Sequence, residues 1–212
     1  MRLANIEGMD LALAPSTHQR DERMRALELL LSRQSVNLLQ EPAPEGAELD
    51  LILDAGLRAP DHGRLRPWRF VLIRGEQRLA WADRIAEIIL ARDPANGQMM
   101  SERYRAWVWR TPLIIAVGAE VRAGHAIPEI EQVLSAGAAA MNMLNALSML
   151  GYGGMWVTGL NSYDPKVNKV LGFEAPSRLV GFLGVGTPKP QPKDAPKIIR
   201  PARAEHTRDW VG

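Results

Sequence analysis

The 212-residue chain contains no cysteine. This absence excludes disulfide bonds, a thiolate nucleophile and cysteine-ligated zinc or iron–sulfur clusters. The chain also has no apolar run long enough to cross a bilayer, and near its start only LALA, 11–14, separates Asp10 from Pro15. Such a stretch is too short for the apolar region of a signal peptide. We therefore expect a soluble, cytoplasmic protein.

The chain carries little excess charge of either sign, with 26 Lys and Arg against 24 Asp and Glu and a formal net charge of +2. A nucleic-acid partner or an anionic membrane is therefore not expected. Its length and its 46% hydrophobic residues suit a single core. We predict a poorly ordered extension over 1–22 and one domain over 23–212, with structure beginning near Arg23 and a basic, proline-rich C-terminal arm over 187–212.

Several common catalytic and binding motifs are missing from the sequence. There is no G-x-x-x-x-G-K-[ST], no G-x-G-x-x-G after a predicted strand and no G-x-S-x-G. A P-loop, a dinucleotide-binding Rossmann fold and a hydrolase nucleophile elbow are therefore not expected. The four histidines, at positions 18, 62, 125 and 206, lie in no H-x-x-x-H pair, so we predict no metal site.

Hydrophobic periodicity predicts a chain in which helices outweigh strands, folded as an α+β or α/β sandwich. Gly151 is expected to cap the longest helix, and Asp164 with Pro165 to start a short one. In the helix over 76–92, the residues predicted to be buried are Leu79, Ile85, Ile88 and Ile89. The predicted helices cover 23–35, 44–60, 76–92, 98–109, 129–150 and 164–172, and the predicted strands cover 68–75, 111–120, 153–159 and 177–188.

Arginines and small hydroxyl residues gather at the boundaries of these elements. They occur in SRQS at 32–35, in GLRAPDHGRLRPWRF at 56–70, in WVTG at 156–159 and at Arg200 in the tail. Arg supplies forked donors together with a positive charge, and hydroxyls add donors, so this combination suits a phosphate group.

Each of these residues also has a purely structural interpretation. Arg33 could complement the dipole of the helix that it ends, His62 could be held by Asp61, and Trp156 could be a plain core residue. Arg64, Arg66 and Arg69 are expected to be solvated loop and edge charges. The methionines of the long helix, Met141, Met143 and Met149, are expected to pack against other side chains and not to line a cofactor.

Five segments, spread over about residues 24–188, resemble the nitroreductase family of flavoproteins, and they follow one another in the order that this family has. The resemblance implies an α+β sandwich with a central sheet flanked by helices, which forms an intertwined homodimer. It also implies two FMN molecules at the subunit interface. The five segments are ALELLLSRQS, LILDAGLRAPDHGRLRPWRFVLI, TPLIIAVGAE, EQVLSAGAAAMNMLNALSMLGYGGMWVTG and VGFLGVGTP.

The same resemblance implies roles for individual residues. Arg33 and Ser35 would hold the flavin phosphate and ribityl chain, with Gln34 standing where the family has a second Arg. Arg58 and His62 would reach the flavin of the other subunit from an arm that two prolines stiffen. Trp156 and Thr158 would lie beside the ring, with Val157 in place of an Arg. Arg200, or alternatively Lys197, would meet the phosphate.

The resemblance further implies a reductase that passes hydride from NAD(P)H through FMN to a nitroaromatic, a quinone or a similar acceptor in a ping-pong cycle. No side chain is required as a general acid, because water can supply the protons. Two alternatives stay open: a flavin-binding protein of this fold without nitroreductase turnover, and a nucleic-acid-binding module that uses the basic tail.

Overall fold

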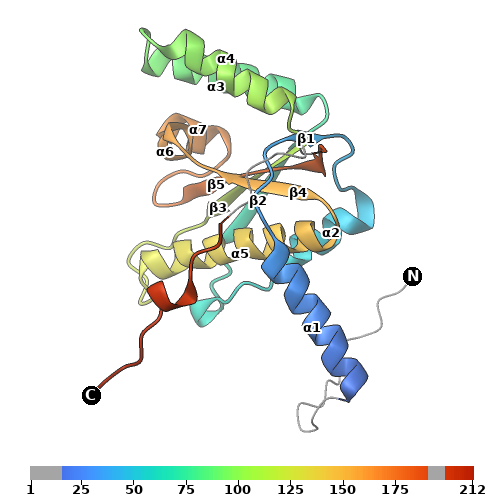
Figure 1. Cartoon of the computed structure of the whole chain (residues 1–212). Helices are drawn as coiled ribbons and strands as arrows, with labels where there is room; N and C mark the ends of the chain where they lie inside the picture. Colours follow the sequence, from blue (N-terminus) through green and yellow to red (C-terminus); the bar gives the residue numbers. More distant parts are fainter. Residues whose placement is uncertain (1–15, 191–198) are drawn as a thin grey trace.

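The computed structural model describes residues 16–190 and 199–212. Five strands form one antiparallel sheet in the order β1-β5-β3-β2, with β4 also paired to β5 (Figure 1). The expectations for 1–15 and for Lys197 lie outside the described residues. The strands are β1 (Leu39–Gln40), β2 (Trp68–Arg74), β3 (Leu113–Ala119), β4 (Gly153–Val157) and β5 (Arg178–Pro188).

Helices cover both faces of this sheet. Figure 1 shows α2 and α5 on one face and α3 with α4 on the opposite face. Two short helices, α6 and α7, connect β4 to β5. The helices are α1 (Thr17–Ser32), α2 (Gly46–Gly56), α3 (Gln77–Arg92), α4 (Gly97–Trp109), α5 (Glu129–Met149), α6 (Leu160–Tyr163) and α7 (Pro165–Val170), with 3-10 turns at His62–Arg64 and Arg203–Glu205.

The core has two halves, one on each side of β3. Every residue of β3 is buried, which explains why this strand reads as an unbroken apolar run. Its side chains alternate, so Ile115 packs in the half formed with α2 and α5 and Ile114 packs in the half formed with α3. The predicted α+β sandwich with helices flanking a central sheet is therefore confirmed.

Most predicted elements and caps are confirmed. The Asp164 side chain accepts a hydrogen bond of 2.9 Å from the Lys166 amide, and Pro165 is the first residue of α7. Gly151 follows α5 with φ of 84°, a conformation that glycine adopts without strain. Two elements that were not predicted, β1 and α6, have two and four residues, too few to produce a recognisable hydrophobic period.

Two expectations were wrong. Helix α1 begins at Thr17 and not near Arg23, because Ser16 and Gln19 form a capping box in which each side chain bonds the other's backbone amide. Leu79 is 49% exposed. The buried face of α3 runs through Trp81 and Ile85, and Leu79, two residues before Trp81, points away from that face.

Helix α1 projects from the rest of the chain, and none of its residues is buried (Figure 1). Its apolar side chains are therefore exposed, and α5 adds further exposed apolar side chains. A single chain leaves this apolar surface uncovered. The residues are Met24, Leu27, Leu29, Leu30 and Leu31 on α1, and Ile130, Leu134, Met141 and Met149 on α5.

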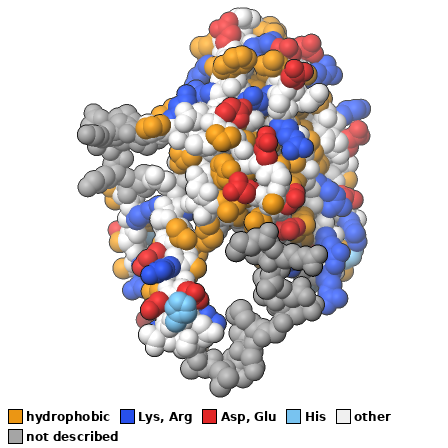
Figure 2. Space-filling view, turned by 90° about the vertical axis from the view of Figure 1, so that its right-hand side faces the viewer, with side chains coloured by type: hydrophobic (Ala, Val, Ile, Leu, Met, Phe, Trp, Pro, Cys, Tyr) orange, Lys and Arg blue, Asp and Glu red, His pale blue; other side chains and the backbone are white. Residues whose placement is uncertain are grey.

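The surface in Figure 2 mixes side chains of all types. Over its upper part, acidic and basic side chains alternate with hydrophobic patches, so that part of the surface is not uniformly basic. Within residues 16–190 and 199–212, no helix combines the length and the hydropathy that crossing a bilayer requires.

Candidate functional site

The segment that follows α1 lies against strand β4. The Val36 amide donates a hydrogen bond of 3.1 Å to the carbonyl oxygen of Gly154. Gly153 leaves room for this approach, since a β-carbon there would lie 2.7 Å from a methyl group of Leu39 and 3.2 Å from Val36. Glycine is therefore needed at 153, and the residues 33–35 are held near β4.

Arg200 of the C-terminal arm meets this same segment. Its Nη2 atom donates a hydrogen bond of 2.7 Å to the carbonyl oxygen of Arg33. Arg33 is half-buried, whereas Gln34, Ser35 and Arg200 are exposed. Among the described residues, no carboxylate forms an ion pair with either arginine. The Arg200 guanidinium is thus held against the backbone of Arg33, in the segment that bonds β4 through Val36.

Trp156 of β4 occupies an unusual position for a core residue. Its indole lies directly on Gly181 of β5, where a β-carbon would collide with Nε1. The ring also faces α5, because a β-carbon at Gly137 would lie 3.6 Å from its Cη2 atom. Nε1 is buried and has no acceptor in the described part of the chain. Buried donors without partners are rare, and this one sets Trp156 apart from a side chain whose polar atoms are all paired.

The chain turns sharply directly after Trp156 and Val157. Val157 pairs with Phe182 of β5 and is half-buried, and Thr158 is exposed. Gly159 then adopts φ of 103°, which only glycine reaches without strain. The strand therefore ends here and α6 begins, which leaves the Thr158 side chain at the surface.

The arm over 58–69 is fixed to α5. Ser135 donates a hydrogen bond of 2.8 Å to the carbonyl oxygen of Pro60, and His62 Nδ1 lies 2.7 Å from Glu131 Oε2. The interpretation that Asp61 holds His62 is wrong, because the Asp61 carboxylate accepts from the Arg66 amide over 2.7 Å. The partner of His62 is a residue of α5, 69 positions away along the chain.

The other arginines of this arm are at the surface. Arg58 is exposed, and its side chain has no hydrogen-bond partner among the described residues. Arg64 and Arg66 are exposed and have φ of 56° and 51°. Arg69 forms an ion pair with Glu120, so it is an edge charge, as predicted.

The predicted site residues therefore form two groups within one chain. Arg33, Gln34, Ser35 and Arg200 lie where the α1 end meets β4, whereas Arg58 and His62 lie by the N-terminal half of α5. No hydrogen bond or ion pair among the described residues joins one group to the other.

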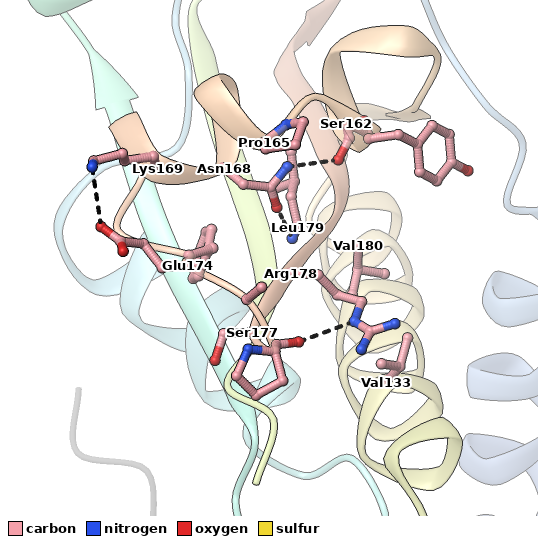
Figure 3. A pocket seen from close by; sticks show the side chains of 14 residues that line it. Val133, Ser162, Pro165, Asn168, Lys169, Glu174, Ser177, Arg178, Leu179 and Val180 are labelled. Carbon is pink, nitrogen blue, oxygen red and sulfur yellow. Dashed lines mark hydrogen bonds and ion pairs between the residues drawn. The ribbon is translucent and has the colours of Figure 1, made fainter. Parts of the chain in front are cut away.

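A cavity of about 660 Å³, lined by residues of α5, α6, α7 and β5 and of the segment between α7 and β5, was not predicted from the sequence (Figure 3). Val133 of α5 and Val180 of β5 line it from two sides of its wall. Figure 3 shows Asn168 at its wall, where the side-chain amide donates to the Ser162 carbonyl oxygen over 3.0 Å. Lys169 and Glu174 form an ion pair of 3.9 Å across its rim. None of the predicted site residues lines this cavity.

A second cavity, of about 290 Å³, lies between α4 and the end of β4. Val157 and Thr158 line it together with residues of α4. It was also missed, because the sequence gives no indication that α4 would lie over this part of the sheet.

Two tyrosines have altered acidity. Burial raises the pKa of Tyr104, whose hydroxyl accepts a hydrogen bond of 2.8 Å from Trp81. The pKa of Tyr152 is also raised, chiefly because its hydroxyl donates to the Glu48 carboxylate over 2.6 Å. In the described ranges, no three acidic or histidine side chains come close enough together to hold a metal ion.

The chain is similar to several known proteins over most of its length. YdjA of Escherichia coli, named as a candidate NAD(P)H nitroreductase, is 40% identical over 166 residues, which are 78% of this chain and 90% of YdjA. A protein of Haemophilus influenzae with the same kind of name is 29% identical and covers 89% of this chain and 98% of its own.

Solved structures share the fold at lower identity. A nitroreductase-like family protein from Bacillus cereus has a TM-score of 0.72 at 23% identity, covering 95% of this chain and 100% of its own. A candidate nitroreductase from Desulfovibrio desulfuricans, solved in complex with FMN, has a TM-score of 0.64 at 24% identity. The match covers 88% of this chain and 97% of its own. The sequence model of the nitroreductase family matches residues 30–187, and the chain therefore belongs to the nitroreductase family.

Proposed function

We propose that the protein is an FMN-dependent NAD(P)H oxidoreductase that reduces small organic acceptors such as nitroaromatics or quinones. One observation carries this proposal: the Arg200 guanidinium bonds the backbone of Arg33, in a segment that joins a strand whose Trp156 has a buried donor without an acceptor. A phosphate at one end and a polar ring system at the other are the two groups that such an arrangement suits.

The residues beside β4 fit the phosphate end of FMN. Arg33 and Arg200 supply charge and forked donors, and the Ser35 hydroxyl is exposed next to them. Gln34 and Val157 are uncharged, so few cations are available close to this site. Arg200 therefore contributes more to the free energy of phosphate binding than it would if Gln34 and Val157 were arginines.

The segment around Trp156 fits the ring end of FMN. The buried Nε1 lacks an acceptor, and leaving such a donor unpaired costs about 1–3 kcal/mol. A ring carbonyl or ring nitrogen could accept from it. Beyond Trp156, the exposed Thr158 and the turn at Gly159 leave the chain open to a flat group lying against the end of β4.

We further propose that two copies of the chain complete each site. Arg58 and His62 share no hydrogen bond with Arg33 or Arg200 among the described residues of one chain, but a second copy could bring them to the flavin. The exposed apolar side chains of α1 and α5 supply a surface that such a dimer would bury.

FMN, when bound, supplies the redox chemistry by taking a hydride from NAD(P)H and passing electrons to the acceptor in a ping-pong sequence. The chain's own part is positional and electrostatic. Arg33, Arg58 and Arg200 offset the negative charge of the cofactor. No described residue is needed as a proton donor, since the exposed end of β4 is open to water.

The visible absorption spectrum of the purified protein tests this proposal. We expect an oxidised-flavin spectrum, release of about one FMN per chain, and bleaching when NADPH or NADH is added without oxygen. Bound FMN that neither nicotinamide bleaches would favour a flavin-binding protein of this fold without reductase turnover. A colourless protein that takes up no added FMN would overturn the proposal.

A further inference from the structure

The second cavity has arginines and aromatic side chains in its walls, and the proposed flavin site gives no reason for them. It measures about 290 Å³ and lies on the face of the sheet opposite α5. Its walls combine three residues of α4 and the arginine that caps this helix with the end of β4 and the residue after it: Arg103, Tyr104, Trp107, Arg110, Val157 and Thr158.

Arg103 and Arg110 give this cavity an uncompensated positive charge. They are seven residues apart, about two helical turns, and so lie on the same face of α4. Neither side chain forms an ion pair or a hydrogen bond within residues 16–190 and 199–212, whereas Arg105 of the same helix pairs with Asp83. No acidic residue lines the cavity. Two guanidiniums without a carboxylate attract an anion.

Aromatic rings form the floor between the two arginines. The ring centroid of Trp107 lies 5.5 Å from that of Tyr104 and 6.4 Å from that of Phe182. Burial raises the pKa of Tyr104, so its hydroxyl stays neutral and adds no negative charge to oppose an anion. A flat ring could stack on this floor while its acidic group faces the guanidiniums.

The size and position of the cavity narrow the choice of ligand. A volume of about 290 Å³ suits a molecule with one aromatic ring, and it is too small for a whole dinucleotide. Val157 and Thr158, which line the cavity, also belong to the segment expected beside the flavin. A ligand in the cavity would therefore lie next to the proposed redox site.

We propose that this cavity binds small aromatic acids, with the carboxylate between Arg103 and Arg110, and that such acids are acceptors of the enzyme. The second part rests on the proposed function. For a nitro acid, NAD(P)H gives two electrons and a proton as hydride equivalent and solvent gives a second proton. One N–O bond breaks, and nitroso acid, NAD(P)⁺ and water are formed.

Calorimetric titration of the purified protein with benzoate and with benzamide tests the binding site. The two probes have the same shape and differ in charge. We expect benzoate to bind at least about tenfold more tightly, as charge-assisted bonds to Arg imply. The double variant Arg103→Gln, Arg110→Gln should lose this preference, and the matched control Arg105→Gln should keep it. Equal affinities in the unaltered protein, or a preference that survives in the double variant, would overturn the site.

Kinetics with 4-nitrobenzoate and 4-nitrobenzamide test the role as acceptor. The double variant should raise KM for the acid about tenfold and leave KM for the amide unchanged. Reduction of the amide with no preference for the acid would overturn the acceptor assignment. If neither compound is reduced, the acceptor assignment fails; the flavin spectrum and its bleaching decide the proposed function, and the benzoate titration decides whether the cavity binds aromatic acids.

Discussion

Arg200 donates a hydrogen bond of 2.7 Å from Nη2 to the carbonyl oxygen of Arg33, which lies 167 residues earlier in the chain. This contact closes the C-terminal arm onto the end of α1. It also leaves the remaining donors of the Arg200 guanidinium free for an anion at the same place.

Replacing Arg200 with alanine is expected to weaken FMN binding about tenfold or more, because a charge-assisted hydrogen bond contributes about 1.5–3 kcal/mol. Titration of the apoprotein with FMN, followed by quenching of flavin fluorescence, measures the effect. Arg203→Ala is the matched control, since Arg203 is an exposed arginine of the same arm. Equal FMN affinities for the Arg200 variant and the unaltered protein would remove Arg200 from the site.

Gly181→Ala is expected to destabilise the protein by about 1–3 kcal/mol, because the new β-carbon collides with the Trp156 indole. Since the indole would move, FMN affinity should fall as well. Gly137→Ala provides the control: its β-carbon would lie in ordinary contact, 3.6 Å from the same ring, and alanine favours a helix. Urea unfolding and FMN titration of both variants give the comparison. Equal stabilities of the two variants would contradict the role of Gly181.

A mixed dimer tests whether two chains build each site. One chain carries Arg33→Ala, and its partner carries the double change Arg58→Ala, His62→Ala. If sites are shared, one of the two sites in the mixed dimer is intact and binds FMN with full affinity, while the other has both defects. We then expect about one tightly bound FMN per mixed dimer. If each site is instead built within a single chain, each site of the mixed dimer contains one defect, and the mixed dimer binds no FMN tightly.

The Tyr152 hydroxyl makes the free energy of unfolding depend on pH in the alkaline range. Its hydrogen bond to Glu48 raises its pKa above the ordinary value of 10.0. Because the pKa of Tyr152 is higher in the folded state, the stability that this hydrogen bond contributes is fully present below pH 10.0. It is lost as the pH rises through the folded-state pKa. Tyr152→Phe should therefore cost about 1 kcal/mol near pH 8 and progressively less above pH 10. Unfolding in urea across this range measures it, and a pH-independent difference would contradict this account.

Local sequence patterns predicted the elements of this fold well. The apolar run of β3 and the long helix α5 were recognisable because their periods arise within one element. The start of α1 was missed, although Ser16 and Gln19 have the spacing of a capping box. Leu79 was misplaced because the sequence does not show which face of α3 meets the sheet, and this leucine lies two residues before the buried Trp81.

The residues of the candidate site come from a family resemblance and stay a prediction, whereas their contacts come from the structure. Sequence could not show that His62 pairs with Glu131, because that contact joins two elements that only packing brings together. It also could not show that the Trp156 donor is left without an acceptor, which depends on Gly181 lying beneath the ring.

The sequence by itself determined which residue types are available: no thiol, few histidines, and arginines beside hydroxyls at the ends of helices and strands. It also determined the elements, since helix and strand periods depend on near neighbours along the chain. Only the tertiary structure decided that Arg200 meets Arg33 and that Arg103 and Arg110 share a cavity with Thr158. These contacts join segments from different elements, and only the packing of helices on the sheet brings such segments together.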